Sequence, residues 1–228
     1  METTGIGNSS LAGFRHTLIA WGRENFRPFP WRFTENPYHI LIAEVMLHRT
    51  QAKQIVPIYQ RFIKRYPGIA DVARSDRDEL RLELYSLGLH WRIDLIRDMA
   101  AEITARFGGE VPQAREELLG LPGVSQYIAS AVRCFAWNSP DALIDTNTVR
   151  VAGRLFGLET KDSSRRSKKF AHLLEGLVDP DSPRDYGFAI LDLASKVCTA
   201  RVAPDCVACP LTRWCAYGTR STADARKE

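Results

Sequence analysis

The chain has 228 residues, a formal net charge of +4 and a hydrophobic content of 45%, a composition typical of a soluble globular protein with one or two domains. No apolar run reaches the roughly 20 residues that a membrane-spanning helix needs, which argues against a membrane protein. The first ten residues, METTGIGNSS, lack the basic and apolar regions of a secretory signal. We therefore expect a cytoplasmic protein, associated with the nucleoid if the source is prokaryotic.

Apolar residues recur at helical spacing along nearly the whole chain, and strand-like alternation is absent. Pro37 suits the first position of a helix, and Asp76 with Glu79 suits a capping box. The polar tail 218–228 is expected to fray. The sequence therefore predicts an all-α protein. The expected helices span residues 11–23, 37–51, 53–66, 77–86, 91–107, 113–119, 125–137, 146–156, 165–178 and 184–197.

Four of the five cysteines lie close together, with the spacing Cys198-x7-Cys206-x2-Cys209-x5-Cys215. Four thiolates can enclose either a zinc ion or a 4Fe-4S cluster. A zinc ribbon normally has two C-x2-C pairs. Because this segment has only one such pair and helical surroundings, it favours an iron–sulfur cluster, with zinc or unrelated thiols as alternatives. Cys134, on the apolar side of its helix, is interpreted as a small core residue.

Residues 115–133, REELLGLPGVSQYIASAVR, predict two helices joined by a tight turn at 121–124. The first N–H groups of the second helix are free, and its positive end can bind phosphate. The segment resembles a helix–hairpin–helix, with Ser125 where the common form L-P-G-V-G has its second glycine. An ordinary turn between helices is the alternative. The basic stretch KDSSRRSKK at 161–169 fits either a nucleic-acid contact or a solvated loop.

Two acidic residues stand out from apolar surroundings. Asp145, in ALIDTNTVR, is expected to cap the helix 146–156. A carboxylate at a helix start is held in one direction, which also suits it to stabilise a developing positive charge. Glu44 lies within the apolar helix 37–51, and a buried glutamate is uncommon unless it is paired or functional.

Taken together, these motifs resemble the endonuclease III superfamily of helix–hairpin–helix DNA glycosylases. They occur in the family's order over roughly residues 15–217, from PFPWR (28–32) to the four cysteines. The resemblance implies a two-lobed fold. One lobe is a six-helix barrel domain (29–139) with the hairpin (115–133), and the other (1–28 plus 140–228) carries an iron–sulfur loop (198–215). The first cysteine gap of seven residues departs from the family's usual six.

PFPWR and AEVMLHRTQ are similar to the branch that contains adenine and thymine-mismatch DNA glycosylases. Adenine enzymes usually carry a further C-terminal domain, whereas this sequence stops shortly after Cys215. Tyr127 occupies a position that is usually serine in adenine enzymes and lysine in strand-cleaving ones. Gly88-Leu89 also resembles the thymine enzymes. The resemblance therefore favours removal of thymine or uracil from G·T and G·U mismatches, with an adenine glycosylase or a non-catalytic DNA-binding protein as alternatives.

The resemblance also implies a role for each site residue. Asp145 would stabilise the sugar cation or orient water, Glu44 would position water or protonate the base, and Tyr127 would line the base pocket. His48 and Arg49 would fill the gap left by the flipped base. The other DNA contacts would come from Gly123, Ser125, Gln126 and Asn147, and the 4Fe-4S ligands would be Cys198, Cys206, Cys209 and Cys215. The expected partner is mismatched double-stranded DNA, bound by a monomer.

Overall fold

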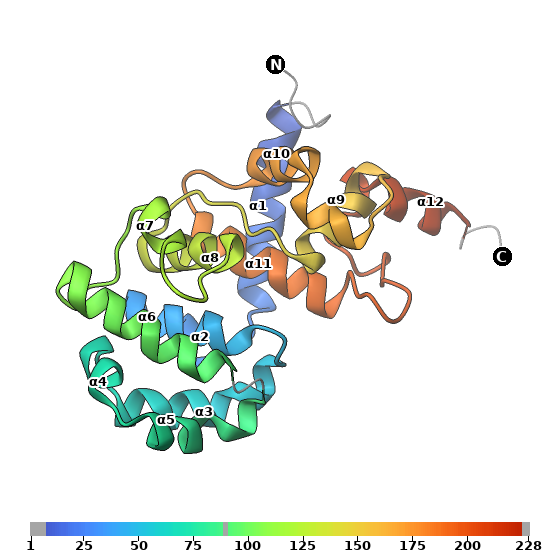
Figure 1. The fold of residues 1–228 in the computed structure, drawn as a ribbon. Helices are drawn as coiled ribbons and strands as arrows, with labels where there is room; N and C mark the ends of the chain where they lie inside the picture. The colour runs from blue at the N-terminus through green and yellow to red at the C-terminus, as the bar shows by residue number, and fades with distance from the viewer. Residues whose placement is uncertain (1–7, 89–90, 225–228) are drawn as a thin grey trace. The chain divides into compact units, whose positions relative to one another are not determined.

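A computed structural model of the protein describes residues 8–88 and 91–224, so Leu89 of the Gly88-Leu89 pair lies outside the described residues. Within these ranges the regular elements are all helices (Figure 1), which confirms the all-α prediction. The chain divides into two compact units. Unit 1 comprises Met1–Arg27 and Asn138–Glu228, and unit 2 comprises Pro28–Trp137.

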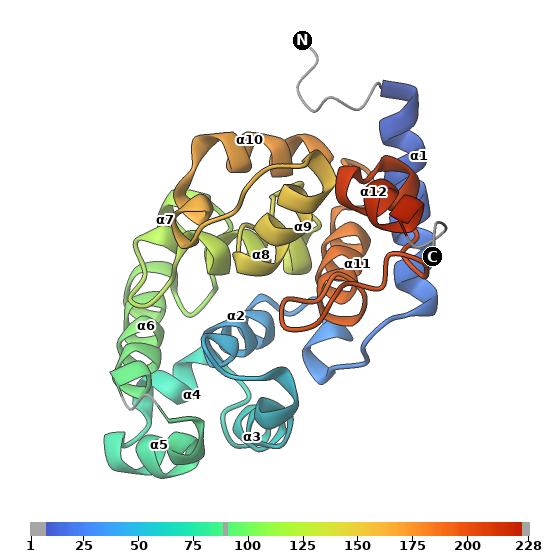
Figure 2. The ribbon, with the colours of Figure 1, turned by 90° about the vertical axis from the view of Figure 1, so that its right-hand side faces the viewer.

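Unit 2 is built around α2 (Pro37–Leu47), which packs against α3, α6 and α8. Eight consecutive or near-consecutive side chains of α2 are buried, from Tyr38 to Met46. A helix that is apolar all round is stable only inside a core, and Figure 2 shows neighbouring helices of the unit flanking α2. The remaining elements are η1 (Pro30–Arg32), α3 (Ala52–Arg65), α4 (Ile69–Arg74), α5 (Arg77–Leu84), η2 (Tyr85–Leu87), α6 (Trp91–Phe107), α7 (Arg115–Leu119) and α8 (Gln126–Trp137).

Several boundaries in unit 2 differ from the prediction. The helix that was expected over 37–51 ends at Leu47, because His48 leaves the helical backbone with ψ of 108°, and Arg49 follows with a left-handed φ of 61°. The short helix α4 was not predicted at all. Asp76 caps α5 as expected. The carboxylate of Glu79, expected in a capping box, instead accepts a hydrogen bond from Arg65 at 2.7 Å.

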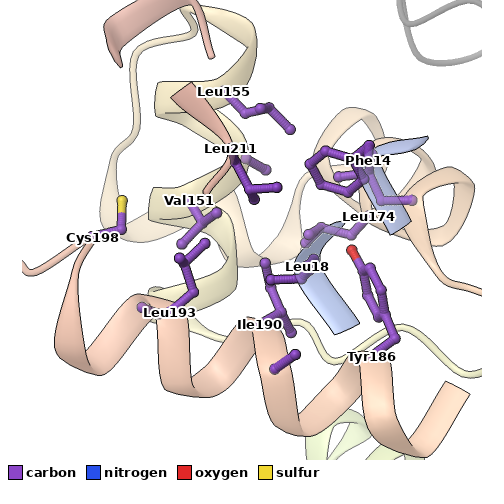
Figure 3. Close-up of a cluster of buried hydrophobic side chains, with 14 of the residues drawn as sticks. Phe14, Leu18, Val151, Leu155, Leu174, Tyr186, Ile190, Leu193, Cys198 and Leu211 are labelled. Carbon is purple, nitrogen blue, oxygen red and sulfur yellow. The ribbon is translucent and has the colours of Figure 1, made fainter. Parts of the chain in front are cut away.

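Unit 1 contains α1 (Asn8–Glu24), α9 (Thr146–Phe156), η3 (Asp162–Arg166), α10 (Lys168–Leu177), α11 (Pro183–Lys196), η4 (Thr212–Trp214) and α12 (Ala216–Asp224). Helices α1 and α11 pack closely at Gly22, where an added Cβ would lie 2.4 Å from Ala189 Cβ. Phe14 and Leu18 of α1 enter the same core as Ile190 and Leu193 of α11 (Figure 3). Cys198 lies at the edge of this core, beside Val151 and Leu193.

The C-terminal segment corrects a second expectation. Residues 218–224 of the tail 218–228, which was expected to fray, belong to α12 (Ala216–Asp224), which packs against α9, whereas 225–228 lie outside the described residues. The guanidinium of Arg154 lies 5.4 Å from the centroid of the Tyr217 ring, a cation–π distance. Contacts with α9 therefore stabilise a helix that its polar sequence did not reveal. Among the described residues, none of the helices has the length and apolar character needed to cross a membrane.

Candidate functional site

Asp145 is the N-cap of α9, as predicted. Its Oδ1 accepts hydrogen bonds from the backbone N–H groups of Asn147 at 2.9 Å and Thr148 at 2.8 Å. The Thr148 hydroxyl accepts in return from the backbone N–H of Asp145 at 3.0 Å, which completes a capping box. Oδ2 accepts from Nδ2 of Asn147 at 2.6 Å. The carboxylate is therefore held in one orientation at the positive end of a helix.

A hydrogen-bonded path leads from this carboxylate to the first cysteine of the cluster. Arg150 donates from Nη1 to Oδ1 of Asn147 at 3.1 Å and from Nε to the carbonyl oxygen of Cys198 at 3.0 Å. Burial lowers the pKa of Arg150, whereas the nearby Cys198 and Asp145 favour its charged form. Sequence reasoning missed Arg150. The available signal was its spacing of three residues from Asn147 on one helix face.

Cys215 interacts electrostatically with each of the other three C-terminal cysteines, and Cys209 also interacts with Cys198. The pKa of Cys209 is raised to about 11, mainly by burial and to a smaller extent by the neighbouring Cys215 and Cys198. Burial likewise raises the pKa of Cys215, which also senses Cys198 and Cys206. In the part of the chain that the structure describes, no group of three or more His, Cys, Asp or Glu side chains is placed to hold a metal ion.

The surroundings of these thiols nevertheless suit sulfur ligands. Arg154 donates from Nη1 to Sγ of Cys198 at 3.2 Å, and the N–H of Gly218 donates to Sγ of Cys215 at 3.3 Å. Donors of this kind stabilise thiolates bound to a cluster. The segment 199–210 has no buried residue. Because such a segment lacks a core of its own, a metal or cluster bound by the four cysteines would hold its two ends together.

The hairpin places its backbone at the surface. Gly123 has a φ of 77°, and an added Cβ there would lie 3.3 Å from Leu95, so glycine serves both the turn and the packing. Ser125 caps α8, because its hydroxyl accepts from the N–H of Ile128 at 3.2 Å. Both residues are exposed. Serine thus replaces the family's usual glycine while it keeps the helix start intact.

Arg115 joins the two helices of the hairpin, although no sequence motif indicated this role. It donates from Nη1 to Oε1 of Gln126 at 3.3 Å and from Nη2 to Oγ of the buried Ser130 at 3.0 Å. Gln126 is exposed beside Gly123 and Ser125, whereas the next residue, Tyr127, is partly buried. The hairpin residues that were predicted to contact DNA are therefore gathered at one helix start.

The remaining predicted residues belong to α2 and the loop after it. Glu44 is only 4% exposed, as its place in an apolar helix suggested. His48 and Arg49 are exposed and lie beyond the end of α2. A left-handed backbone at arginine costs roughly 1 to 3 kcal/mol and is often found at functional sites. Glu44, His48 and Arg49 thus lie in unit 2 with the hairpin, whereas Asp145, Asn147 and the cysteine ligands lie in unit 1.

Comparison with known proteins places these residues in a family. Residues 42–176 match the family model described as HhH-GPD superfamily base excision DNA repair protein. A thymine-DNA glycosylase of Aeropyrum pernix is 38% identical over 93% of this chain and 97% of its own length. A thymine/uracil-DNA glycosylase of Pyrobaculum aerophilum is also 38% identical, over 87% and 88%.

Structural similarity agrees with this assignment. The structure of a thermostable thymine-DNA glycosylase superposes with a TM-score of 0.86 at 32% identity, covering 93% of this chain and 98% of that one. Adenine DNA glycosylases are also similar, at 29% to 32% identity. The chain therefore belongs to the HhH-GPD superfamily of base excision DNA repair proteins.

Proposed function

We propose that this protein is a DNA glycosylase that removes thymine or uracil from G·T and G·U mismatches. The observation that carries the proposal is the carboxylate of Asp145, fixed at the start of α9 by Asn147. The similarity to thymine and thymine/uracil-DNA glycosylases over most of the chain supports the choice of base. A base inside a duplex is inaccessible, so the nucleotide must first be flipped out.

The reaction breaks the bond between the sugar C1′ and the base nitrogen. The base leaves with the electron pair of that bond, and positive charge builds on the sugar. Asp145 would stabilise this charge. Water then adds its hydroxyl to C1′, and its proton is released. Glu44 would position that water or protonate the leaving base. Thymine leaves as an anion more readily than adenine does, so protonation matters less here.

The DNA would be held mainly by the hairpin and by the loop after α2. Exposed backbone at Gly123 and Ser125, together with Gln126, suits the phosphates of one strand. Tyr127 would stack on the flipped base. His48 and Arg49 would fill the vacated space and contact the remaining guanine. Asn147 would contact the strand as well as orient Asp145.

We further propose that unit 2 serves as the six-helix barrel domain, and that unit 1 carries a 4Fe-4S cluster on Cys198, Cys206, Cys209 and Cys215. When bound, the cluster would supply a structural joint, not redox chemistry on the base. The support is the group of mutually interacting thiols, with N–H donors aimed at Cys198 and Cys215. Exposed Arg201 and Arg213 of this region would approach DNA phosphates.

A panel of duplexes tests the choice of base. We expect base release from G·T and G·U duplexes, where weaker pairing than in a matched duplex lowers the cost of flipping. We expect none from G·A, oxidised G·A or fully matched duplexes. Release would be measured by alkaline strand cleavage under single-turnover conditions. Release of adenine would instead establish an adenine glycosylase. Binding without release from any duplex would establish a non-catalytic DNA-binding protein.

Borohydride trapping tests the absence of strand cleavage. A lysine amine can form a Schiff base with the sugar, whereas the Tyr127 phenol cannot. We expect the wild-type protein to give no covalent DNA adduct, and Tyr127→Lys to give one that denaturing gel electrophoresis detects. Tyr127→Phe is the matched control and should give no adduct. An adduct with the wild-type protein would contradict the prediction.

A further inference from the structure

The basic stretch at 161–169 forms a continuous exposed surface in unit 1. It comprises the 3-10 helix η3 and the first residues of α10. We call it the η3–α10 basic surface, and its five basic residues are all exposed: Lys161, Arg165, Arg166, Lys168 and Lys169. The proposed reaction assigns no role to this surface.

Three of the five charges have no counter-charge among the residues that the structure describes. Lys161 lies 3.6 Å from Glu159, and Arg165 lies 2.8 Å from Asp162. Within the described residues, Arg166, Lys168 and Lys169 make neither an ion pair nor a side-chain hydrogen bond. Such an excess of like charge repels itself, and a bound polyanion would relieve that repulsion.

The backbone that presents these charges is anchored on both sides. The buried Ser164 accepts through its hydroxyl from the N–H of Lys161 at 2.9 Å. Phe170, 5% exposed, packs into the core of unit 1. The unpaired side chains therefore project from a fixed frame. No aromatic side chain is exposed between residues 161 and 170, so the surface lacks the platform on which single-stranded bases stack.

We propose that the η3–α10 basic surface binds the phosphate backbone of duplex DNA more than about half a helical turn, roughly five base pairs, from the mismatch. The inference rests on the proposed function for the identity of the polyanion. The segment that leads to the surface packs against α9 at Gly153, where an added Cβ would lie 2.3 Å from Thr160. The surface is thus attached to α9, the helix that Asp145 caps.

Removing the unpaired charges tests the proposal. The variant Arg166→Gln/Lys168→Gln/Lys169→Gln is compared with the wild-type protein on mismatched duplexes of about 12 and about 40 base pairs, the shorter being little more than one helical turn. We expect affinity for the longer duplex to fall by about tenfold or more. The slope of log affinity against log salt should become shallower by about 2.7, because each lost phosphate contact contributes about 0.9.

On the short duplex we expect less than a twofold change in affinity and an unchanged single-turnover rate at saturating enzyme. Lys53→Gln/Lys64→Gln is a control that removes two exposed charges from α3 in unit 2. On the long duplex, its salt slope should differ less from the wild-type slope than that of the triple variant does. The proposal is overturned if the triple variant binds the long duplex like wild type, if both duplexes lose affinity equally, or if single-stranded nucleic acid is the more sensitive ligand. Failure of base release by the wild-type protein would overturn the proposed function instead, without altering these binding measurements.

Discussion

Replacing Asp145 with asparagine is expected to lower the single-turnover rate of thymine release from a G·T duplex by about 10³-fold. The amide keeps an oxygen that can accept from the N–H groups of Asn147 and Thr148, as Oδ1 does now. It removes the negative charge that the sugar cation requires. Asparagine is also a good N-cap, so the free energy of unfolding should change by less than about 1 kcal/mol. Binding of the mismatched duplex should persist.

Asp76→Asn is the matched control for this experiment. Asp76 caps α5 through the same pair of bonds, accepting from the N–H groups of Asp78 at 2.9 Å and Glu79 at 3.1 Å. Its substitution removes one carboxylate from a helix start without touching the proposed site. We expect wild-type base release from this variant. A rate for Asp145→Asn within tenfold of wild type would show that another group stabilises the sugar, and an equal loss in both variants would point to a general charge effect.

Local chemistry explains which parts of the fold were predictable. The limits of α9 were predicted correctly because Asp145 caps its start and Gly157, with a φ of 65°, ends it. The end of α2 was predicted wrongly because His48-Arg49-Thr50 contains no glycine or proline that would stop a helix. The left-handed backbone at Arg49 depends on tertiary structure. The polar α12 was missed for a related reason, since packing against α9 stabilises it.

The candidate site divides in the same way. Asp145, Glu44 and the cysteines stand out in the sequence because each is an unusual residue in its local pattern. Arg115 and Arg150 do not, because their partners lie on other segments. Arg115 reaches Ser130, fifteen residues away, and Arg150 reaches the carbonyl of Cys198, forty-eight residues away. The roles of charged residues whose partners lie on distant segments therefore become visible only once the chain is folded.

The path from Cys198 through Arg150 and Asn147 to Asp145 gives the cysteine loop a mechanical connection to the proposed chemistry. Cys198 contributes its carbonyl oxygen to Arg150 and its sulfur to Arg154. Any group that fixes this cysteine also fixes the acceptor that orients Arg150. A structural cluster could therefore affect catalysis without exchanging electrons with the DNA.

Replacing Cys209 with serine is expected to have the second large effect. The wild-type protein should contain iron and acid-labile sulfide and show a visible absorption band, and the variant should lose all three. A cluster that binds only the folded state adds its binding free energy to the free energy of unfolding. Losing about 3 kcal/mol of it would lower the melting temperature by about 6 to 12 °C for a chain of this size. Base release should fall as the segment 199–210, which has no buried residue, loses its joint.

Cys134→Ala separates a cluster ligand from a cysteine of the core. Cys134 is 1% exposed in α8, in unit 2, and the thiol cluster lies in unit 1. We expect this variant to keep wild-type iron, sulfide and absorbance, with only the modest loss of stability that follows removal of one buried sulfur. Zinc without iron in the wild-type protein would replace the cluster with a zinc site. Absence of any metal from protein prepared without oxygen would show that the four thiols serve another purpose.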